Sequence, residues 1–196
     1  MATMNRLEDY TVAILVTDGF EQVELTEPRK ALNEAGARTV IVSPKADIVQ
    51  GMNHSDKGDT FKVDLPLERA DVAQFDALLL PGGVANPDRL RINKKAVEFV
   101  RAFFDGGKPI AAICHAPWML VETGIAKGYR LTSFPSLQTD VRNAGGDWVD
   151  EASVTDRQIT TSRKPDDLPE FNKAMLHLFE ESVTRGEERA HAGSAS

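Results

Sequence analysis

The sequence predicts an α/β fold in which an open, mainly parallel sheet carries helices on both faces. Two observations lead to this prediction. Apolar and β-branched runs, the pattern of strands that are buried on both faces, recur along the chain. Segments with helical character separate these runs, and strands that alternate with helices form parallel sheets. We expect one domain over residues 1–185, followed by a disordered polar tail over 186–196.

In the first half of the chain, glycine and proline mark the ends of the expected elements. Gly36 is the expected C-cap of the first helix, and Pro28 inside that helix kinks it or marks its first full turn. Pro66 restricts the last strand of this half to an edge, because a proline cannot donate to a ladder of hydrogen bonds. The expected elements, in order, are a strand over 11–17, a helix over 22–36, a strand over 37–43, a loop or short hairpin over 45–60 and an edge strand over 61–67.

The second half of the chain continues the same alternation. A Pro-Gly-Gly turn ends its first strand, and Gly106 and Gly107 stop the helix that follows. Asp166 or Asp167 is the expected N-cap of the last helix, with Pro169 in its first turn. The expected elements, in order, are a strand over 75–83, a helix over 94–105, a strand over 109–114, helices over 115–124 and 136–146, strands over 148–156 and 157–162, and a helix over 168–185.

Composition and charge argue against several classes of protein. The formal net charge of -7 disfavours nucleic acid or an anionic membrane surface as a partner, since both require a basic face. The sequence contains no apolar run of about 18 residues, the length that a membrane span requires. The first ten residues lack the features of a targeting signal. We therefore expect a cytoplasmic protein that does not bind membranes.

No sequence pattern indicates a cofactor or a metal. The single cysteine cannot form a disulfide within the chain, and the four histidines are too scattered to form a ligand cluster with it. Neither of the glycine-rich nucleotide-binding patterns, G-x-G-x-x-G or G-x-x-x-x-G-K-[ST], is present. The expectation is a site built from side chains and backbone alone.

The single cysteine, Cys114, lies where a buried strand is expected to turn sharply into a helix. Ala112 and Ala116 flank it, and small neighbours of this kind allow the tight turn of a nucleophile elbow. A thiol at a helix N-terminus has its pKa lowered from about 8.5 to between about 3.5 and 7.5. The alternative is a buried cysteine that acts only as a small apolar side chain. The elbow position and the adjacent histidine favour a reactive thiol.

A reactive thiol needs a base, and His115 is the best candidate because it follows the cysteine directly. His54, in a polar loop, stays possible, whereas His177 in the last helix and His191 in the tail are less suitable. An orienting acid would complete a Cys-His-acid arrangement, and Asp88 is expected at the same edge of the sheet. Its choice among 30 acidic residues rests on spacing alone.

Two further features are expected near this edge of the sheet. Glu24 follows the first strand. If Glu24 is buried, its pKa is raised and its protonated carboxyl can donate a hydrogen bond to the sulfur. Glu21 and Glu27 are ordinary solvated helix charges unless the fold buries them. Gly82 and Gly83 either supply backbone N–H groups to an oxyanion or simply end a strand.

Six segments in this order resemble the PfpI family of intracellular cysteine proteases within the DJ-one (DJ-1) superfamily, and the later ones resemble its bacterial stress-protein branch, described as proteases or protein deglycases. The resemblance covers residues 11–185. The segments are DGFEQVELTEP, FDALLLPGG, NPDRLR, GKPIAAICHAPWML, NAGGDWVDEASVTD and TSRKPDDLPEFN.

The resemblance implies a flavodoxin-like three-layer sandwich with a nucleophile at Cys114, backed by His115 and held ionised by Glu24. It implies that backbone N–H groups of Gly83 and His115 bind the oxyanion. The family's third catalytic residue, a glutamate from a neighbouring subunit, corresponds to Asp88, which is shorter by one methylene. Ala116 replaces a usual glycine. Family members are dimers or larger oligomers, up to hexamers, and Glu21 is the residue expected near a subunit contact.

The leading functional hypothesis is a stress-response cysteine hydrolase whose substrates are small carbonyl compounds or modified proteins. Peptidase and deglycase action share one chemical scheme, so the sequence does not separate them; a peptidase needs an extended groove, whereas a deglycase needs only a small pocket. The alternative is a redox sensor or chaperone-like protein, whose exposed low-pKa thiol is oxidised to sulfenic or sulfinic acid without turnover. A domain of this fold with an inactive site is the third possibility.

Overall fold

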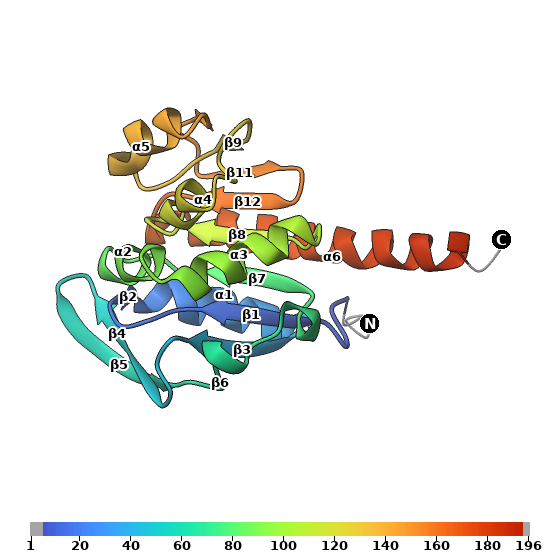
Figure 1. Cartoon of the computed structure of the whole chain (residues 1–196), viewed down its shortest axis with the longest axis horizontal. Coiled ribbons are helices and arrows are strands. Elements are labelled where there is room, and N and C mark those ends of the chain that lie inside the picture. The colour runs from blue at the N-terminus through green and yellow to red at the C-terminus, as the bar shows by residue number, and fades with distance from the viewer. Residues whose placement is uncertain (1–5, 194–196) are drawn as a thin grey trace.

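The computed structural model describes residues 6–193, and for 187–193 it describes the backbone alone. The main sheet consists of β1 (Thr11–Leu15), β3 (Arg38–Ser43), β6 (Leu65–Pro66), β7 (Ala77–Leu80), β8 (Ile110–Ile113), β11 (Ser153–Asp156) and β12 (Ile159–Ser162). These strands lie in the order β11-β12-β8-β7-β1-β3-β6 (Figure 1). Every neighbouring pair is parallel except β11 and β12. The predicted mainly parallel α/β sheet is confirmed, and Pro66 lies in an edge strand as expected.

Apolar side chains of the central strands alternate between two cores, one on each face of the sheet. In β1, Ala13 and Leu15 belong to one core, whereas Val12 and Ile14 belong to the other. The first core packs against α3 (Lys94–Asp105) and α4 (Trp118–Glu122), and the second against α1 (Gln22–Glu34) and α6 (Leu168–Gly193). Because both faces are covered, the strands are apolar throughout, which explains the continuous apolar runs in the sequence.

A second, three-stranded sheet with the order β2-β4-β5 lies outside the main one. It consists of β2 (Phe20–Glu21), β4 (Ile48–Asn53) and β5 (Asp56–Lys62). The two longer strands form a hairpin that extends beyond the main sheet (Figure 1). Of the two alternatives for the polar segment 45–60, the hairpin is therefore the one observed. The predicted edge strand is shorter than expected, because Phe61 and Lys62 belong to this hairpin.

Two helices differ from the sequence prediction. The helix α2 (Ala85–Arg91) occupies a segment that we expected to be a loop. Pro87 lies in its first turn, where the missing N–H is not needed, so the proline does not prevent the helix. The last helix continues past residue 185 to Gly193, so the backbone is helical over much of the expected tail. Glutamate, arginine and alanine favour such an extension; the remaining tail residues, 194–196, lie outside the described residues.

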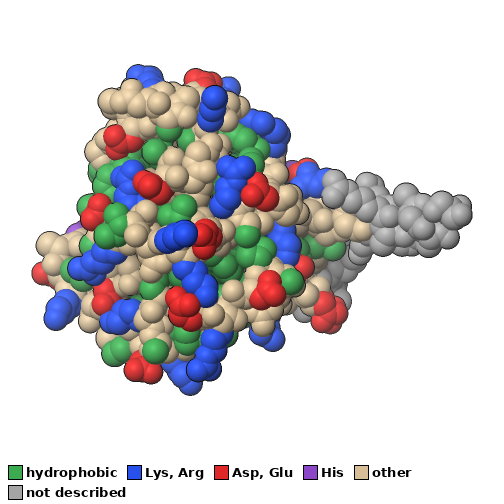
Figure 2. Space-filling view, viewed as in Figure 1, with side chains coloured by type: hydrophobic (Ala, Val, Ile, Leu, Met, Phe, Trp, Pro, Cys, Tyr) green, Lys and Arg blue, Asp and Glu red, His purple; other side chains and the backbone are tan. Residues whose placement is uncertain are grey.

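The remaining elements complete the end of the molecule that carries residues 130–148. They are β9 (Arg130–Leu131), α5 (Gln138–Asn143) and β10 (Asp147–Trp148), with β9 and β10 paired in parallel. None of the described helices is both long enough and apolar enough to cross a bilayer. Figure 2 shows basic and acidic side chains interspersed over one face of the molecule.

Candidate active site at Cys114

Cys114 occupies a sharp turn directly after β8, as the elbow pattern predicted. Its φ angle is 64°, in the left-handed region that residues other than glycine rarely adopt. Its N–H donates to the Ser162 carbonyl at 3.0 Å, and its carbonyl accepts from the Phe134 N–H at 2.8 Å. Cys114 is only 6% exposed. Strained backbone of this kind persists where the surroundings hold it, and it is concentrated at functional sites.

The electrostatic environment of the thiol differs from the expected one. The helix α4 begins only at Trp118, so Cys114 lies outside the helix, in the turn before it. Burial, together with the Glu24 carboxyl, raises the pKa of the Cys114 thiol, although the N–H groups of Gly83 and His115 act in the opposite direction. The expectation of a thiol pKa lowered by a helix N-terminus is therefore wrong. A raised pKa favours the neutral thiol, and a neighbouring base that accepts its proton would favour the thiolate.

His115 lies where such a base must be. Its Nδ1 is 3.1 Å from the Cys114 Sγ. The imidazole stacks on Phe134, with 4.5 Å between ring centroids, and meets the ring of Trp118 edge-on. Burial lowers the pKa of His115, so the ring is neutral near pH 7 and has a free lone pair. The geometry therefore allows Nδ1 to accept the thiol proton.

The other ring nitrogen of His115 contacts a serine and not the expected acid. Ser136 Oγ lies 3.3 Å from Nε2. Asp88 is exposed on α2 and makes no hydrogen bond to His115 within the described part of the chain. A Cys-His-acid arrangement with Asp88 is therefore not formed inside one chain. Ser136 could not have been identified from the sequence, because it lies 21 residues after the histidine, in a 3-10 helix over Pro135–Leu137 whose sequence gives no sign of a contact with His115.

Glu24 is completely buried beside the thiol, as expected for a residue that acts on it. Its Oε2 accepts the Gly82 N–H at 3.0 Å, whereas its Oε1 has no hydrogen-bond partner among the described residues. Burial raises the pKa of Glu24 to about 8, and the negative charge of Glu21 adds to this effect. A carboxyl with one oxygen free of donors is suited to carry a proton on that oxygen.

Gly82 and Gly83 bring the backbone of the loop after β7 against the thiol. A Cβ on Gly82 would lie 2.5 Å from Glu24 Oε2 and 2.6 Å from the Cys114 Cβ, so only glycine fits. Gly83 has a φ angle of 72°, and a Cβ there would lie 2.5 Å from the Gly19 carbonyl. This close approach directs the Gly83 N–H at the sulfur, where an oxyanion formed on a bound substrate would accept it.

Cys114, His115 and Glu24 line a cavity of about 870 Å³. Several elements that are distant in sequence contribute to its wall. The loop after β1, the turn of the β4–β5 hairpin, α2 and the segment after β12 all contribute. The charged and titratable side chains among the lining residues, other than these three, are Asp18, Glu21, His54, Lys57, Arg89, Lys164 and Asp166.

No histidine side chain among the described residues other than that of His115 forms a hydrogen bond to Cys114. His54 lines the cavity from the hairpin turn, but it makes no hydrogen bond to Cys114 within the described residues. His177 is exposed on α6, 3.3 Å from Glu181. His191 belongs to the segment whose side chains are not described. Within the described part of the chain, no three His, Cys, Asp or Glu side chains cluster closely enough to hold a metal ion.

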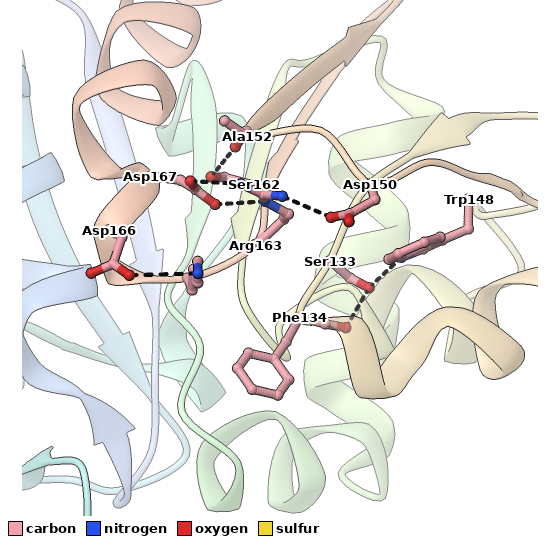
Figure 3. A network of polar contacts seen from close by, with 10 residues as sticks. Ser133, Phe134, Trp148, Asp150, Ala152, Ser162, Arg163, Asp166 and Asp167 are labelled. Atoms are coloured by element: carbon pink, nitrogen blue, oxygen red, sulfur yellow. Dashed lines mark hydrogen bonds and ion pairs between the residues drawn. The ribbon is translucent and has the colours of Figure 1, made fainter.

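A polar network fixes the segment after β12 that closes one side of the cavity (Figure 3). Arg163 donates to both carboxylate oxygens of Asp167, at 2.8 and 3.0 Å, and to Asp150 at 2.7 Å. Asp167, one of the two expected caps of the last helix, thus binds a side chain instead. The network holds Lys164 and Asp166, which line the cavity and pair at 3.5 Å.

The comparisons with known proteins show the family of this chain. A family model described as the DJ-1/PfpI family matches residues 10–178. The chain belongs to the DJ-1/PfpI family. It is 42% identical over 168 residues to a protein of Pyrococcus abyssi named a deglycase, and the match covers 86% of this chain and 98% of that protein. It is 40% identical over 171 residues to the protein/nucleic acid deglycase 2 of Escherichia coli, which covers 86% of this chain and 96% of that protein.

The fold comparison extends the DJ-1/PfpI assignment to three dimensions. The crystal structure of Drosophila melanogaster DJ-1beta superposes with a TM-score of 0.77 at 28% identity, over 90% of this chain and 94% of that one. The expected three-layer sandwich is confirmed.

The raised pKa of Glu24 makes a testable prediction for this DJ-1/PfpI protein. Because the folded-state pKa of about 8 exceeds the ordinary value of 4.5, the folded protein holds the Glu24 proton more tightly than the unfolded chain does. The contribution of this proton to the free energy of unfolding is therefore complete below pH 4.5 and is lost as the pH rises to 8. Relative to Glu24→Gln, the wild type should lose on the order of 5 kcal/mol of unfolding free energy over that interval. Urea denaturation at several pH values measures the difference, and a constant difference would contradict the buried, protonated carboxyl.

Proposed function

We propose that this protein is a cysteine-dependent deglycase, a hydrolase that removes reactive dicarbonyl adducts, such as those of methylglyoxal, from thiols and amines of proteins. The observation that carries the proposal is the approach of Cys114 Sγ to His115 Nδ1, at 3.1 Å, in the wall of a cavity. The names of the two relatives support the same reaction class.

In the proposed mechanism, His115 acts as a general base and not as the counter-ion of a preformed thiolate. The substrate thiol or amine leaves the aldehyde carbon of the adduct with the proton of the neighbouring hydroxyl, which regenerates the aldehyde. His115 Nδ1 takes the Cys114 proton as the sulfur adds to that carbon, and the Ser136 hydroxyl can accept a hydrogen from Nε2. In the tautomer with a hydrogen on Nε2, for which the Ser136 hydroxyl can act as acceptor, the Nδ1 lone pair is free to take the thiol proton. Glu24, protonated below pH 8, donates a hydrogen bond to the sulfur as negative charge develops there.

The carbonyl oxygen of the substrate becomes negative in the same step. The N–H groups of Gly83 and His115, which approach the sulfur, are the donors that would receive it. Transfer of the hydrogen on the aldehyde carbon to the neighbouring ketone carbon leaves a thioester on Cys114, and hydrolysis of this thioester by one water molecule releases lactate and the free Cys114 thiol. An adduct of methylglyoxal with a thiol or amine gives the free thiol or amine and lactate, so the aldehyde carbon is oxidised while the neighbouring ketone is reduced. No external oxidant or reductant is needed.

The shape of the site and the state of the thiol favour this function over the alternatives. The cavity of about 870 Å³ at the thiol has room for a small adduct, and a deglycase requires no more than that. A redox sensor requires an exposed thiol of low pKa, but Cys114 is buried and burial raises its pKa.

The experiment that tests the proposal uses N-acetylcysteine and N-acetyllysine treated with methylglyoxal. Release of lactate is followed by proton NMR, which detects both enantiomers, and casein cleavage is measured on the same sample. We expect lactate at a rate above that of the spontaneous reaction and no casein fragments. Casein cleavage without lactate would indicate a peptidase, and stoichiometric oxidation of Cys114 by peroxide with neither activity would indicate a sensor.

We also propose that the protein works in the cytoplasm as a homo-oligomer, a dimer or a hexamer. A lone thiol stays reduced in that compartment. Asp88 is exposed on α2, and the first residue of this helix lines the cavity. Asp88 is therefore available to act on His115 across a subunit contact.

A further inference from the structure

Glu21 is a buried carboxylate that the mechanism above does not use. It is 9% exposed and lines the same cavity as Cys114 and Glu24. Its position at the end of β2 places it immediately before α1, which carries Glu24 one turn later. Burying a carboxylate is costly unless it is paired or hydrogen-bonded, so its environment needs an explanation.

The partner of Glu21 is the backbone of the hairpin turn. The N–H of His54 approaches both carboxylate oxygens, at 3.1 Å and 3.3 Å. His54 has a φ angle of 56°, so the turn at this residue is left-handed and its N–H is directed inward. The same turn brings His54 into the cavity wall. Glu21 thus anchors the part of the hairpin that lines the cavity.

Glu21 also acts on Glu24 through its charge. Two like charges close together disfavour each other's ionised form, and the titratable neighbours that affect Glu24 are Cys114 and Glu21. The other charged and titratable groups that line the cavity come from different elements; they are Asp18 after β1, His54 and Lys57 on the hairpin, Arg89 on α2, His115 after β8, and Lys164 and Asp166 after β12.

We propose that Glu21 is a second functional carboxylate of this site, a positioning residue that anchors the hairpin turn at the cavity and keeps the proton on Glu24. The inference deepens the proposed function, because it assigns the group that maintains Glu24 as a hydrogen-bond donor to the sulfur. In this proposal, Glu21 acts inside the active site of its own chain.

The chain offers a matched control for the structural part of this role. Gln22, the next residue, anchors the same hairpin through Asp59: its Oε1 accepts the Asp59 N–H at 2.6 Å, and its Nε2 donates to the Asp59 carboxylate at 2.8 Å. Gln22 is uncharged. Its removal should loosen the hairpin without an electrostatic effect on Glu24.

The test is the rate of Cys114 alkylation by iodoacetamide as a function of pH, which reports on the thiol and does not require turnover. The wild type should show an inflection near pH 8 that disappears in Glu24→Gln, which assigns it to Glu24. Glu21→Gln keeps an acceptor for the His54 N–H but removes the charge, so the inflection should move down by about 0.5 to 1 pH unit. Glu21→Asp should leave it near the wild-type value.

Hydrogen exchange at the His54 amide measures the anchoring. Glu21→Ala should increase its exchange rate at least tenfold, and Gln22→Ala should loosen the hairpin while leaving the inflection unchanged. An inflection that stays in place in Glu21→Gln, or a His54 amide that is equally protected in Glu21→Ala, would overturn the proposal. Absence of lactate release from an otherwise normal alkylation profile would instead contradict the proposed function alone.

Discussion

Replacement of Cys114 by serine is expected to reduce lactate release from methylglyoxal adducts by at least about 10³-fold. A serine hydroxyl is a much weaker nucleophile than a thiol at neutral pH, and His115 and Glu24 are arranged around a sulfur atom. The two side chains are similar in size, so the free energy of unfolding should change by less than about 2 kcal/mol. Lactate NMR and urea denaturation of the same preparation measure the two quantities.

The chain provides a control for the histidine in the same assay. His115→Ala should lose a comparable part of the activity, because a base and a nucleophile that act as a unit do not contribute additively. His177→Ala, which changes an exposed histidine on α6, should retain wild-type turnover. If Cys114→Ser kept more than a tenth of the wild-type rate, covalent catalysis at this residue would have to be abandoned.

The second large effect is expected at Gly82, where alanine should destabilise the protein by about 2 to 4 kcal/mol and reduce turnover at least a hundredfold. The added methyl group would lie 2.5 Å from Glu24 Oε2, 2.6 Å from the Cys114 Cβ and 2.7 Å from the Ile113 carbonyl. Two of these atoms belong to buried side chains, and the third to the backbone at the end of β8. The loop after β7 must therefore move away, taking the Gly83 N–H with it.

Gly186→Ala is the matched control for this substitution. Gly186 lies in α6, and an added methyl group there would have no atom of the described residues within 4 Å outside its own stretch of helix. Alanine should there stabilise the helix by up to about 1 kcal/mol and leave turnover unchanged. Thermal denaturation and lactate release distinguish the two variants. Equal stability of Gly82→Ala and wild type would show that the loop after β7 is far more compliant than its contacts indicate.

The sequence predicted the features of this protein that depend on local patterns. The alternation of apolar runs with helical segments indicated the parallel sheet, because strands covered on both faces must be apolar along their whole length. The small residues around Cys114 indicated a sharp turn after β8, and adjacency was sufficient to bring His115 to the sulfur. Glu24 was expected near the thiol because it follows a strand that ends at the same edge of the sheet.

The features that the sequence did not predict depend on long-range packing. Ser136 contacts His115 from a 3-10 helix 21 residues away in the sequence. Glu21 accepts the backbone N–H of His54 within a separate small sheet. The predicted direction of the shift in the thiol pKa was wrong. A sequence shows that a helix follows the cysteine, but it does not show that this helix begins only at Trp118. It also does not show that burial of the thiol outweighs the effect of the nearby N–H groups.

The sequence by itself thus determined the fold class, the position of Cys114 in a sharp turn after a buried strand, and the identity of its neighbour. Only the tertiary structure decided how the proton is shared among Cys114, His115 and Glu24, because pKa values depend on burial and on charges that approach from distant elements. Hydrophobic periodicity is a property of consecutive residues, whereas the dielectric environment of a buried thiol exists only when the chain has folded around it.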